Sequence, residues 1–265
     1  MTLDLDAYLA RIGWSGPLAA DFTTLSALLD RHVIAIPFEN LDVLLGRPPR
    51  LDLESLQHKL VRARRGGYCY EHTTLFAAIL ERFGFAVIPH SARVTLVAEK
   101  AAAPRTHMFL TVVLPEGTFV VDPGFGGLTP RIPVPTDGTP VPFGADQFRL
   151  ARDGEDYVLE VRTPDKTVSA WVSTLERDYP IDFEMANHFT ATHPSSHFTR
   201  RLMLRAFTDD GRITIANRDV TRFRGTTQET VQLADRKELR ATLAAHFGFD
   251  LDVEPIRVPQ IPEWT

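Results

Sequence analysis

Cys69, His107 and Asp122 are the residues of this chain whose types can together perform covalent chemistry. A thiolate attacks a carbonyl carbon, an imidazole accepts the proton of the thiol, and a carboxylate fixes the imidazole tautomer and supports its charge. The chain contains one cysteine, which excludes an internal disulfide and a metal cage built from cysteines. If Cys69 has a chemical role, it is that of a thiol that accepts an acyl group as a thioester.

The residues around Cys69 place it where a helix begins. The segment reads Arg-Arg-Gly-Gly-Tyr-Cys-Tyr-Glu-His-Thr-Thr-Leu-Phe, so a Gly-Gly turn leads directly into an amphipathic helix. The N-terminus of a helix and nearby cations stabilise a thiolate. A lone cysteine is also often a small buried apolar residue. The turn favours the nucleophile interpretation and leaves the buried one open.

His107 and Asp122 lie at the ends of two apolar runs that read as neighbouring strands. His107 opens the run that continues to Leu114, and Asp122 follows the run Thr118–Val121. The Pro-Glu-Gly sequence between the runs predicts a hairpin, which brings both residues to the same end of a sheet. Each residue alone has a structural explanation, because Asp before Pro-Gly is typical of turns and a strand-edge His is often structural.

The elements that must position these residues change in character near residue 86. Before it, apolar residues recur at helical spacing around positions 18–29 and 75–80, starting at Leu18, and predict helices. After it, short β-rich runs separated by turn signals predict antiparallel strands in a barrel or a curled sheet. These runs are 85–88, 108–114, 118–121, 148–150, 157–161, 203–207 and 212–216. We expect an irregular, proline-rich connection over 128–144 and a helix over about 236–247 that Gly248 ends.

The composition excludes several classes of function. A chain of 265 residues with 44% hydrophobic residues can bury a substantial core. A net charge of -5 with scattered arginines does not indicate a basic surface that would bind a nucleic-acid backbone. No apolar run approaches the roughly 20 residues that span a bilayer, and the first residues are acidic where a signal peptide is basic. We therefore expect a cytoplasmic protein without nucleic-acid or membrane partners.

Six short segments, in order along nearly the whole chain, resemble the arylamine N-acetyltransferase family. The signature of that family is Arg-Gly-Gly-aromatic-Cys, then Thr-His, then Asp-x-Gly-Phe-Gly. Here it reads Arg65-Gly66-Gly67-Tyr68-Cys69, Thr106-His107 and Asp122-Pro123-Gly124-Phe125-Gly126-Gly127. The further matching segments are residues 8–13, 36–41, and 187–189 with 194–198. Any one of these strings is weak, and their joint order is a strong match.

The resemblance implies an α+β fold of the cysteine-proteinase-like superfamily in three parts. These are an N-terminal helical bundle over 1–85, an antiparallel β-barrel with its connecting segment over 86–190, and a C-terminal α/β lid over 191–265. It also implies a Cys69–His107–Asp122 triad and a ping-pong reaction. Acetyl-coenzyme A is then the co-substrate, arylamines or arylhydrazines are the acceptors, and no bound cofactor or metal is required.

The resemblance extends to residues around the triad. It implies substrate contacts from Phe38, Tyr68, Thr106, Phe125 and Gly126. It also implies that Glu39 and Arg64 form a charged pair that holds the loop before Cys69, the alternative being two exposed, unpaired charges. Where the family commonly has Asn, four positions after the cysteine, this chain has Thr73, followed by Thr74.

Other interpretations remain to be weighed. His188, His193 and His197 form a cluster, but Pro194 breaks any single helix through them and the spacing matches no known zinc motif, so we expect no metal site. A papain-like or transglutaminase-like hydrolase would use the same three residue types with water as acceptor. A macrolactam-forming amide synthase of the same family is another alternative. A binding module without activity would not need the three intact residues. The physiological acceptor, the preferred acyl donor and the oligomeric state stay open.

Overall fold

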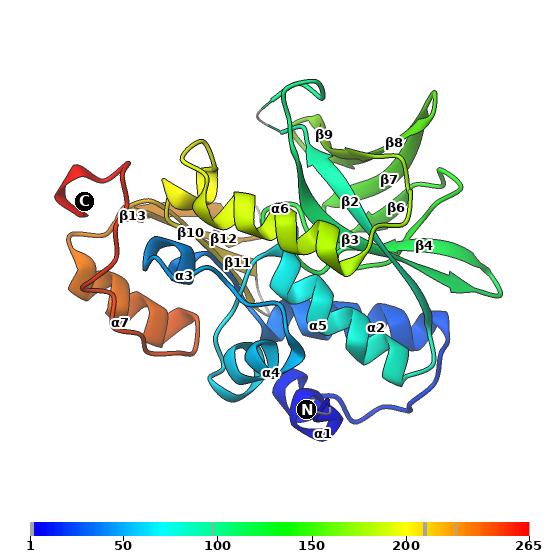
Figure 1. The fold of residues 1–265 in the computed structure, drawn as a ribbon, viewed down its shortest axis with the longest axis horizontal. Coiled ribbons are helices and arrows are strands. Elements are labelled where there is room, and N and C mark those ends of the chain that lie inside the picture. The colour runs from blue at the N-terminus through cyan, green and yellow to red at the C-terminus, as the bar shows by residue number, and fades with distance from the viewer. Residues whose placement is uncertain (1–2, 97, 209–210, 226, 265) are drawn as a thin grey trace.

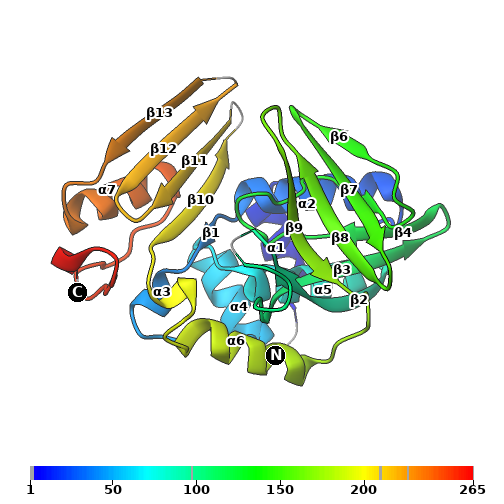
Figure 2. The same ribbon diagram turned by 90° about the horizontal axis from the view of Figure 1, so that it is seen from above.

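The computed structural model describes residues 3–96, 98–208, 211–225 and 227–264. It is an α+β structure in which N-terminal helices pack beside a curled antiparallel sheet, and a second sheet with its own helix lies next to them (Figures 1 and 2). The predicted fold class is confirmed.

The N-terminal helices begin where the sequence supplies caps. Asp4, Asp21 and Asp52 each accept a hydrogen bond from the backbone N–H three residues later. The helical elements are α1 (Leu5–Ile12), α2 (Phe22–Ala35), α3 (Leu41–Leu44), α4 (Leu53–Leu56), the π-helical η1 (Gln57–Arg62) and α5 (Cys69–Arg82). The expectation that helical periodicity starts at Leu18 was wrong. Leu18 precedes the cap of α2 and is exposed, because the chain cannot continue the helix backward through Asp21.

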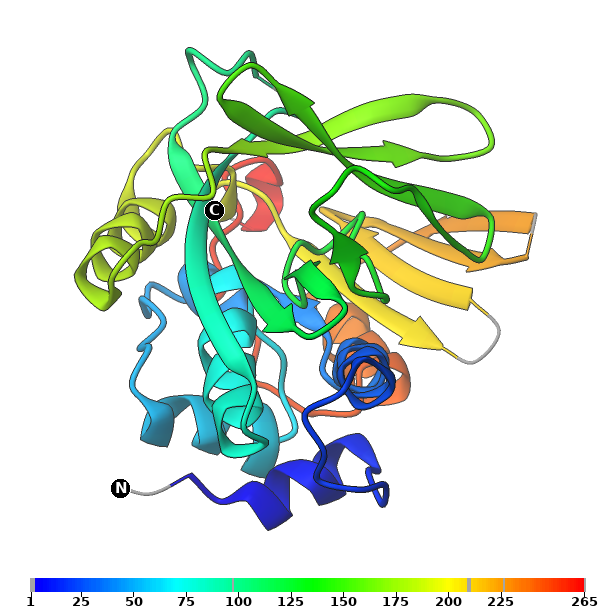
Figure 3. The same ribbon diagram turned by 90° about the vertical axis from the view of Figure 1, so that its right-hand side faces the viewer.

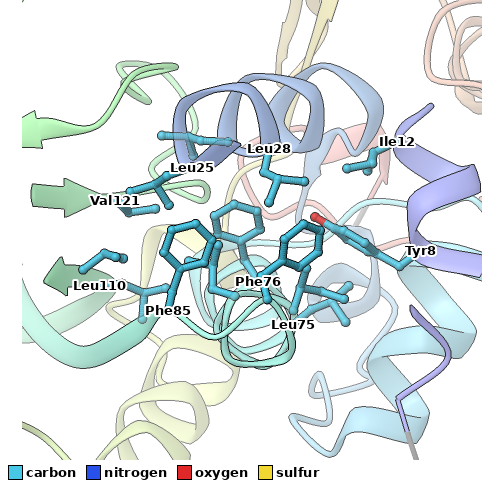
Figure 4. Packing of buried hydrophobic residues seen from close by; sticks show 14 of the residues in the cluster. Tyr8, Ile12, Leu25, Leu28, Leu75, Phe76, Phe85, Leu110 and Val121 are labelled. Atoms are coloured by element: carbon cyan, nitrogen blue, oxygen red, sulfur yellow. The ribbon is translucent and has the colours of Figure 1, made fainter. Parts of the chain in front are cut away.

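The helices and the first strands of the large sheet share one hydrophobic core (Figure 4). Leu28 of α2 and Phe76 of α5 are fully buried beside Tyr8 of α1. Leu110 and Val121, from the two strands that flank His107 and Asp122, belong to the same cluster. Each such buried side chain stabilises the fold by about 1.5–3 kcal/mol. The helix that carries Cys69 and the strands that carry His107 and Asp122 are therefore attached to a common packed core.

The large sheet has eight antiparallel strands in the order β5-β4-β3-β2-β9-β8-β7-β6 and is strongly curled (Figure 3). The curl brings β5 into contact with β7. Its strands are β2 (Ala86–Val94), β3 (Arg105–Leu114), β4 (Gly117–Val121), β5 (Val134–Pro135), β6 (Val141–Phe143), β7 (Asp146–Asp153), β8 (Asp156–Arg162) and β9 (Thr167–Ser173). The connection over 128–144 is not wholly irregular, since it contains β5 and β6. Both are edge strands, where Pro135 and Pro142 are tolerated.

The second sheet joins a strand from the N-terminal region to four strands from the C-terminal region. Its order is β1-β10-β11-β12-β13, all neighbours antiparallel. The strands are β1 (Phe38–Glu39), β10 (Met203–Thr208), β11 (Gly211–Ala216), β12 (Asp219–Arg224) and β13 (Thr227–Gln232). Helix α7 (Arg236–His246) covers one face, and α6 (Pro180–Thr192) runs along the N-terminal helices (Figures 1 and 2).

The side chain of Asn40 adds to the connection between β1 and β10. Its Oδ1 accepts from the N–H of Met203, and its Nδ2 donates to the carbonyl oxygens of Phe198 and Arg201. The C-terminal part therefore does not build its sheet alone. The division into residues 1–85, 86–190 and 191–265 stays a prediction.

Candidate active site

Cys69 is the first residue of α5, as the Gly-Gly turn predicted. Tyr68 caps the helix, and its N–H donates to Glu71 Oε2 at 3.1 Å. The Cys69 side chain is buried, with 4% of its surface exposed, and its sulfur lies 3.8 Å from the carbonyl oxygen of Thr106. The sulfur thus lies at a helix N-terminus and against the strand that carries His107.

Two glycines allow the backbone to close around Cys69. A Cβ at Gly66 would lie 1.9 Å from the carbonyl oxygen of Pro37, and a Cβ at Gly124 would lie 2.6 Å from Cys69 Cα. Neither space can hold a side chain. Gly66 lets the loop before α5 pass close to Pro37, and Gly124 lets the loop after β4 reach the start of α5.

His107 and Asp122 meet at the end of the β3–β4 hairpin. The Nε2 atom of His107 lies 2.8 Å from Asp122 Oδ2, which also accepts from Trp171 Nε1 at 3.1 Å. Both triad side chains are almost completely buried. Because the carboxylate holds the Nε2 proton, Nδ1 is the ring nitrogen available to the thiol.

The surroundings of His107 favour its charged form. Burial lowers the pKa of the imidazole, but the Asp122 charge, the hydrogen bond to it and the nearby Cys69 together raise the pKa to about 10. The arrangement has the parts of an activated nucleophile with an oriented base.

A cavity of about 480 Å³ opens in front of Cys69 and His107. Four of the five predicted substrate contacts line it, namely Phe38, Thr106, Phe125 and Gly126. The structure does not bring Tyr68 to the described lining, so its contact with substrate stays a prediction without support from this cavity. Its side chain is fully buried, and its hydroxyl donates to Asn187 Oδ1 on α6.

The predicted pair of Glu39 and Arg64 is wrong, because Glu39 pairs with Arg65. Arg65 Nη2 lies 2.7 Å from Glu39 Oε1, whereas Arg64 is exposed and has a left-handed backbone with φ 54°. The carbonyl oxygen of Arg64 accepts from Arg11 Nη2. This backbone turn directs the next side chain, that of Arg65, inward.

Glu39 and Arg65 belong to a larger group, here called the charged cluster: Glu39, Asp42, Lys59, Arg65 and Glu71. Lys59 Nζ lies 2.7 Å from Asp42 Oδ2 and 2.7 Å from Glu71 Oε1. Arg65 Nη1 lies 2.7 Å from Asp42 Oδ1. Burial raises the pKa of Glu71 to about 7 even though Lys59 opposes the shift. The charged cluster supports the turn that begins α5.

A second buried group, here called the imidazole chain, was not predicted from the sequence. The Tyr8 hydroxyl bonds to His32 Nδ1 at 2.8 Å, His32 Nε2 to His72 Nδ1 at 2.9 Å, and His72 Nε2 to the carbonyl oxygen of Pro37 at 3.2 Å. Since a carbonyl only accepts, His72 donates through Nε2 and His32 donates to it, which fixes every tautomer. Burial lowers the pKa of His72 to about 4 and that of His32 well below its usual value, so both rings are neutral.

Thr73 occupies the position where the family commonly has asparagine. Its hydroxyl donates to the carbonyl oxygen of Met108 at 3.0 Å and joins α5 to β3. The residue therefore ties the helix of Cys69 to the strand of His107.

The three histidines near the end of α6 do not converge. His188, His193 and His197 are all exposed, and His193 Nδ1 is 2.7 Å from Ser195 Oγ. Across the described ranges, no three or more His, Cys, Asp or Glu side chains are grouped as a metal site would require. Within those same ranges, no helix combines the length and apolarity needed to cross a membrane.

Comparisons with known proteins agree with this geometry. A family model described as N-acetyltransferase matches residues 21–256. The arylamine N-acetyltransferase of Mycolicibacterium smegmatis is 38% identical over 257 residues, which cover 95% of this chain and 94% of that protein. The arylamine N-acetyltransferase of Escherichia coli is 39% identical and covers 95% and 91%.

Solved structures give the same result. The arylamine N-acetyltransferase of Mycobacterium marinum superposes with a TM-score of 0.89 at 35% identity, covering 93% of each chain. Its complex with CoA superposes with a TM-score of 0.88. The family model spans every described strand of both sheets together with Cys69, His107 and Asp122. This chain therefore belongs to the arylamine N-acetyltransferase family and is an acetyltransferase.

Proposed function

We propose that this enzyme transfers an acetyl group from acetyl-coenzyme A to Cys69 and then to the amino group of an arylamine or arylhydrazine, by a ping-pong mechanism. The observation that carries the proposal is the ordered contact from Asp122 to His107 and on to Cys69 at the wall of a single cavity. The relative from M. marinum solved with CoA supports the donor. The names of the relatives support the acceptor class.

In the first half-reaction Cys69 is acetylated. His107 holds the proton of the thiol at Nδ1, and the Cys69 sulfur attacks the carbonyl carbon of the donor thioester. The bond from that carbon to the sulfur of coenzyme A then breaks, and the proton on His107 passes to the departing sulfur. One thioester replaces another, so the enzyme stores the acetyl group without a deep energy minimum.

In the second half-reaction the acceptor amine attacks the Cys69 thioester. An aromatic amine is weakly basic and is a neutral nucleophile at pH 7. Its nitrogen forms the amide bond, the bond from the carbonyl carbon to the Cys69 sulfur breaks, and the amine proton returns to the sulfur through His107. Amide formation drives this step. Phe38, Thr106, Phe125 and Gly126 are proposed to contact the substrates from the cavity wall.

Intact-protein mass spectrometry tests both half-reactions. We expect acetyl-coenzyme A alone to add one acetyl group to the wild-type protein and none to Cys69→Ala. His107→Gln should slow the addition by at least about a hundredfold, since general base catalysis contributes on that order. Adding an aromatic amine should then restore the original mass and give one equivalent of N-acetyl product.

The same experiment separates the alternatives. A protein that gains no acetyl group but cleaves peptides would be a cysteine hydrolase, and the proposal would be wrong. The proposal would also be contradicted if the acetyl-enzyme lost its acetyl group to water and the amine did not increase the rate of that loss.

A further inference from the structure

The wall of the cavity in front of Cys69 is almost without charge. None of its described lining residues is Asp, Glu, Lys or Arg. Besides Cys69 and His107 of the triad, the titratable side chain among them is His197, which is exposed. The rest of the wall is largely apolar and includes four phenylalanines: Phe38, Phe125, Phe189 and Phe198.

Two serine hydroxyls on this wall already have partners. Ser196 Oγ donates to the carbonyl oxygen of Thr190 at 2.6 Å, and Ser195 Oγ pairs with His193 at 2.7 Å. The guanidinium of Arg205 lies behind the wall, where Nη1 donates to the carbonyl oxygen of Gly126. The one charged group on the described wall is the His107 imidazolium, which already faces Asp122, so an anionic group inside the cavity would give up its water without gaining a further cation.

We infer that the preferred acceptors of this enzyme are uncharged aromatic amines with apolar substituents, and that aromatic amines bearing a carboxylate are disfavoured by the cost of desolvating it. This inference rests on the proposed function and names the substrate class of the same site. Burying an unpaired carboxylate is far more costly than burying a neutral polar group of the same size. A cavity of about 480 Å³ accommodates a ring and its substituent.

A matched pair of acceptors tests the inference. 4-Aminobenzoate and its methyl ester differ in charge, and the ester withdraws more electron density from the amine, so chemistry alone favours the acid. Each is mixed with preformed acetyl-enzyme, and the rate of loss of the acetyl group from Cys69 is measured by quenched mass spectrometry. We expect the ester to react at least about tenfold faster than the acid, because only the acid must lose its charge solvation.

A change in the wall adds a second readout. Leu96 lines the cavity and is 43% exposed, so it tolerates a charged replacement. Leu96→Lys should raise the rate for the acid relative to the ester by about fivefold or more, as a nearby ammonium offsets the carboxylate. Leu96→Met, a side chain of similar length without charge, should leave the ratio unchanged.

The outcomes distinguish two failures. Equal or faster reaction of the acid, or a ratio that Leu96→Lys does not alter, would overturn the inference. A third amine, 4-methylaniline, controls for the proposed function itself. If neither 4-methylaniline nor the ester removes the acetyl group from Cys69, the proposed transfer to arylamines is wrong.

Discussion

Two consecutive residues of α5 send their side chains into two buried polar groups of opposite character. Glu71 enters the charged cluster, where carboxylates and cations lie 2.7 Å apart. His72 enters the imidazole chain, which runs from Tyr8 to the carbonyl oxygen of Pro37. Both groups lie directly behind Cys69. One supports the turn before α5 with charge, and the other supports it with neutral hydrogen bonds.

The difference shows two ways of stabilising the same backbone. Buried charges gain stability only when each has a partner, and the charged cluster holds three carboxylates against two cations. The excess carboxylate is consistent with the raised pKa of Glu71. In the imidazole chain every ring nitrogen is used once, as donor or acceptor, and no charge is present. In the folded protein the first group should therefore change its protonation near pH 7, whereas the rings of the second stay neutral from pH 5 to 8.

The largest effect should come from opening the charged cluster. Arg65→Ala removes the cation shared by Glu39 and Asp42, and we expect it to lower the free energy of unfolding by about 3–5 kcal/mol, the usual cost of leaving a buried charge unpaired. Urea denaturation measures it. Arg64→Ala is the matched control and should change stability by less than about 0.5 kcal/mol, since its side chain is exposed. Equal losses from the two variants would contradict the pairing described here.

A pH series should separate the charged cluster from the imidazole chain. In the folded protein the pKa of Glu71 is about 7, well above that of an unfolded glutamate. Between pH 4.5 and 7 the folded state therefore holds a proton that the unfolded state has lost, so the contribution of Glu71 to stability falls as pH rises through this interval. Glu71→Gln removes the titration. Relative to wild type, its free energy of unfolding should rise by about 1 kcal/mol per pH unit across the interval. A constant difference would show that Glu71 is ionised throughout.

The smallest of the three effects belongs to the imidazole chain. Tyr8→Phe removes the donor to His32 Nδ1 and leaves a buried acceptor unpaired, at a cost of about 1–2 kcal/mol. The loss should be the same at every pH from 5 to 8, because both histidines remain neutral in this range. Denaturation at several pH values checks it. A loss that changes with pH would mean that one of the rings is charged.

The parts of the site that the sequence predicted depend on local pattern. A Gly-Gly turn before an amphipathic run is enough to place Cys69 at a helix start, and two apolar runs around a short turn are enough to place His107 and Asp122 at one sheet end. These features involve residues close together in the chain, or strands joined by a tight turn. The fold class and the family followed from the same segments.

What the sequence did not reveal depends on packing between distant elements. The imidazole chain draws one residue from each of α1, α2 and α5, and no spacing marks them. Glu39 pairs with Arg65 and not with Arg64 because Arg64 has a left-handed backbone, which no local sequence pattern predicted. Strand β13 was missed because all its residues are exposed, so it has no alternation of apolar and polar positions. Helix α6 was missed because Ile181 and Met185 are exposed apolar residues that blur its pattern.

Because β1 pairs with β10, the active site can be completed only after the C-terminal part of the chain has been synthesised. The N–H of Met203 bonds to Asn40, 163 positions earlier in the chain. During synthesis the helices around Cys69 emerge long before their partner strand, and domains fold as their residues leave the ribosome. Phe198 and Met203 also line the cavity, so a chain interrupted before them carries the thiol without the pocket. The nucleophile is translated early and becomes a complete site only late in synthesis.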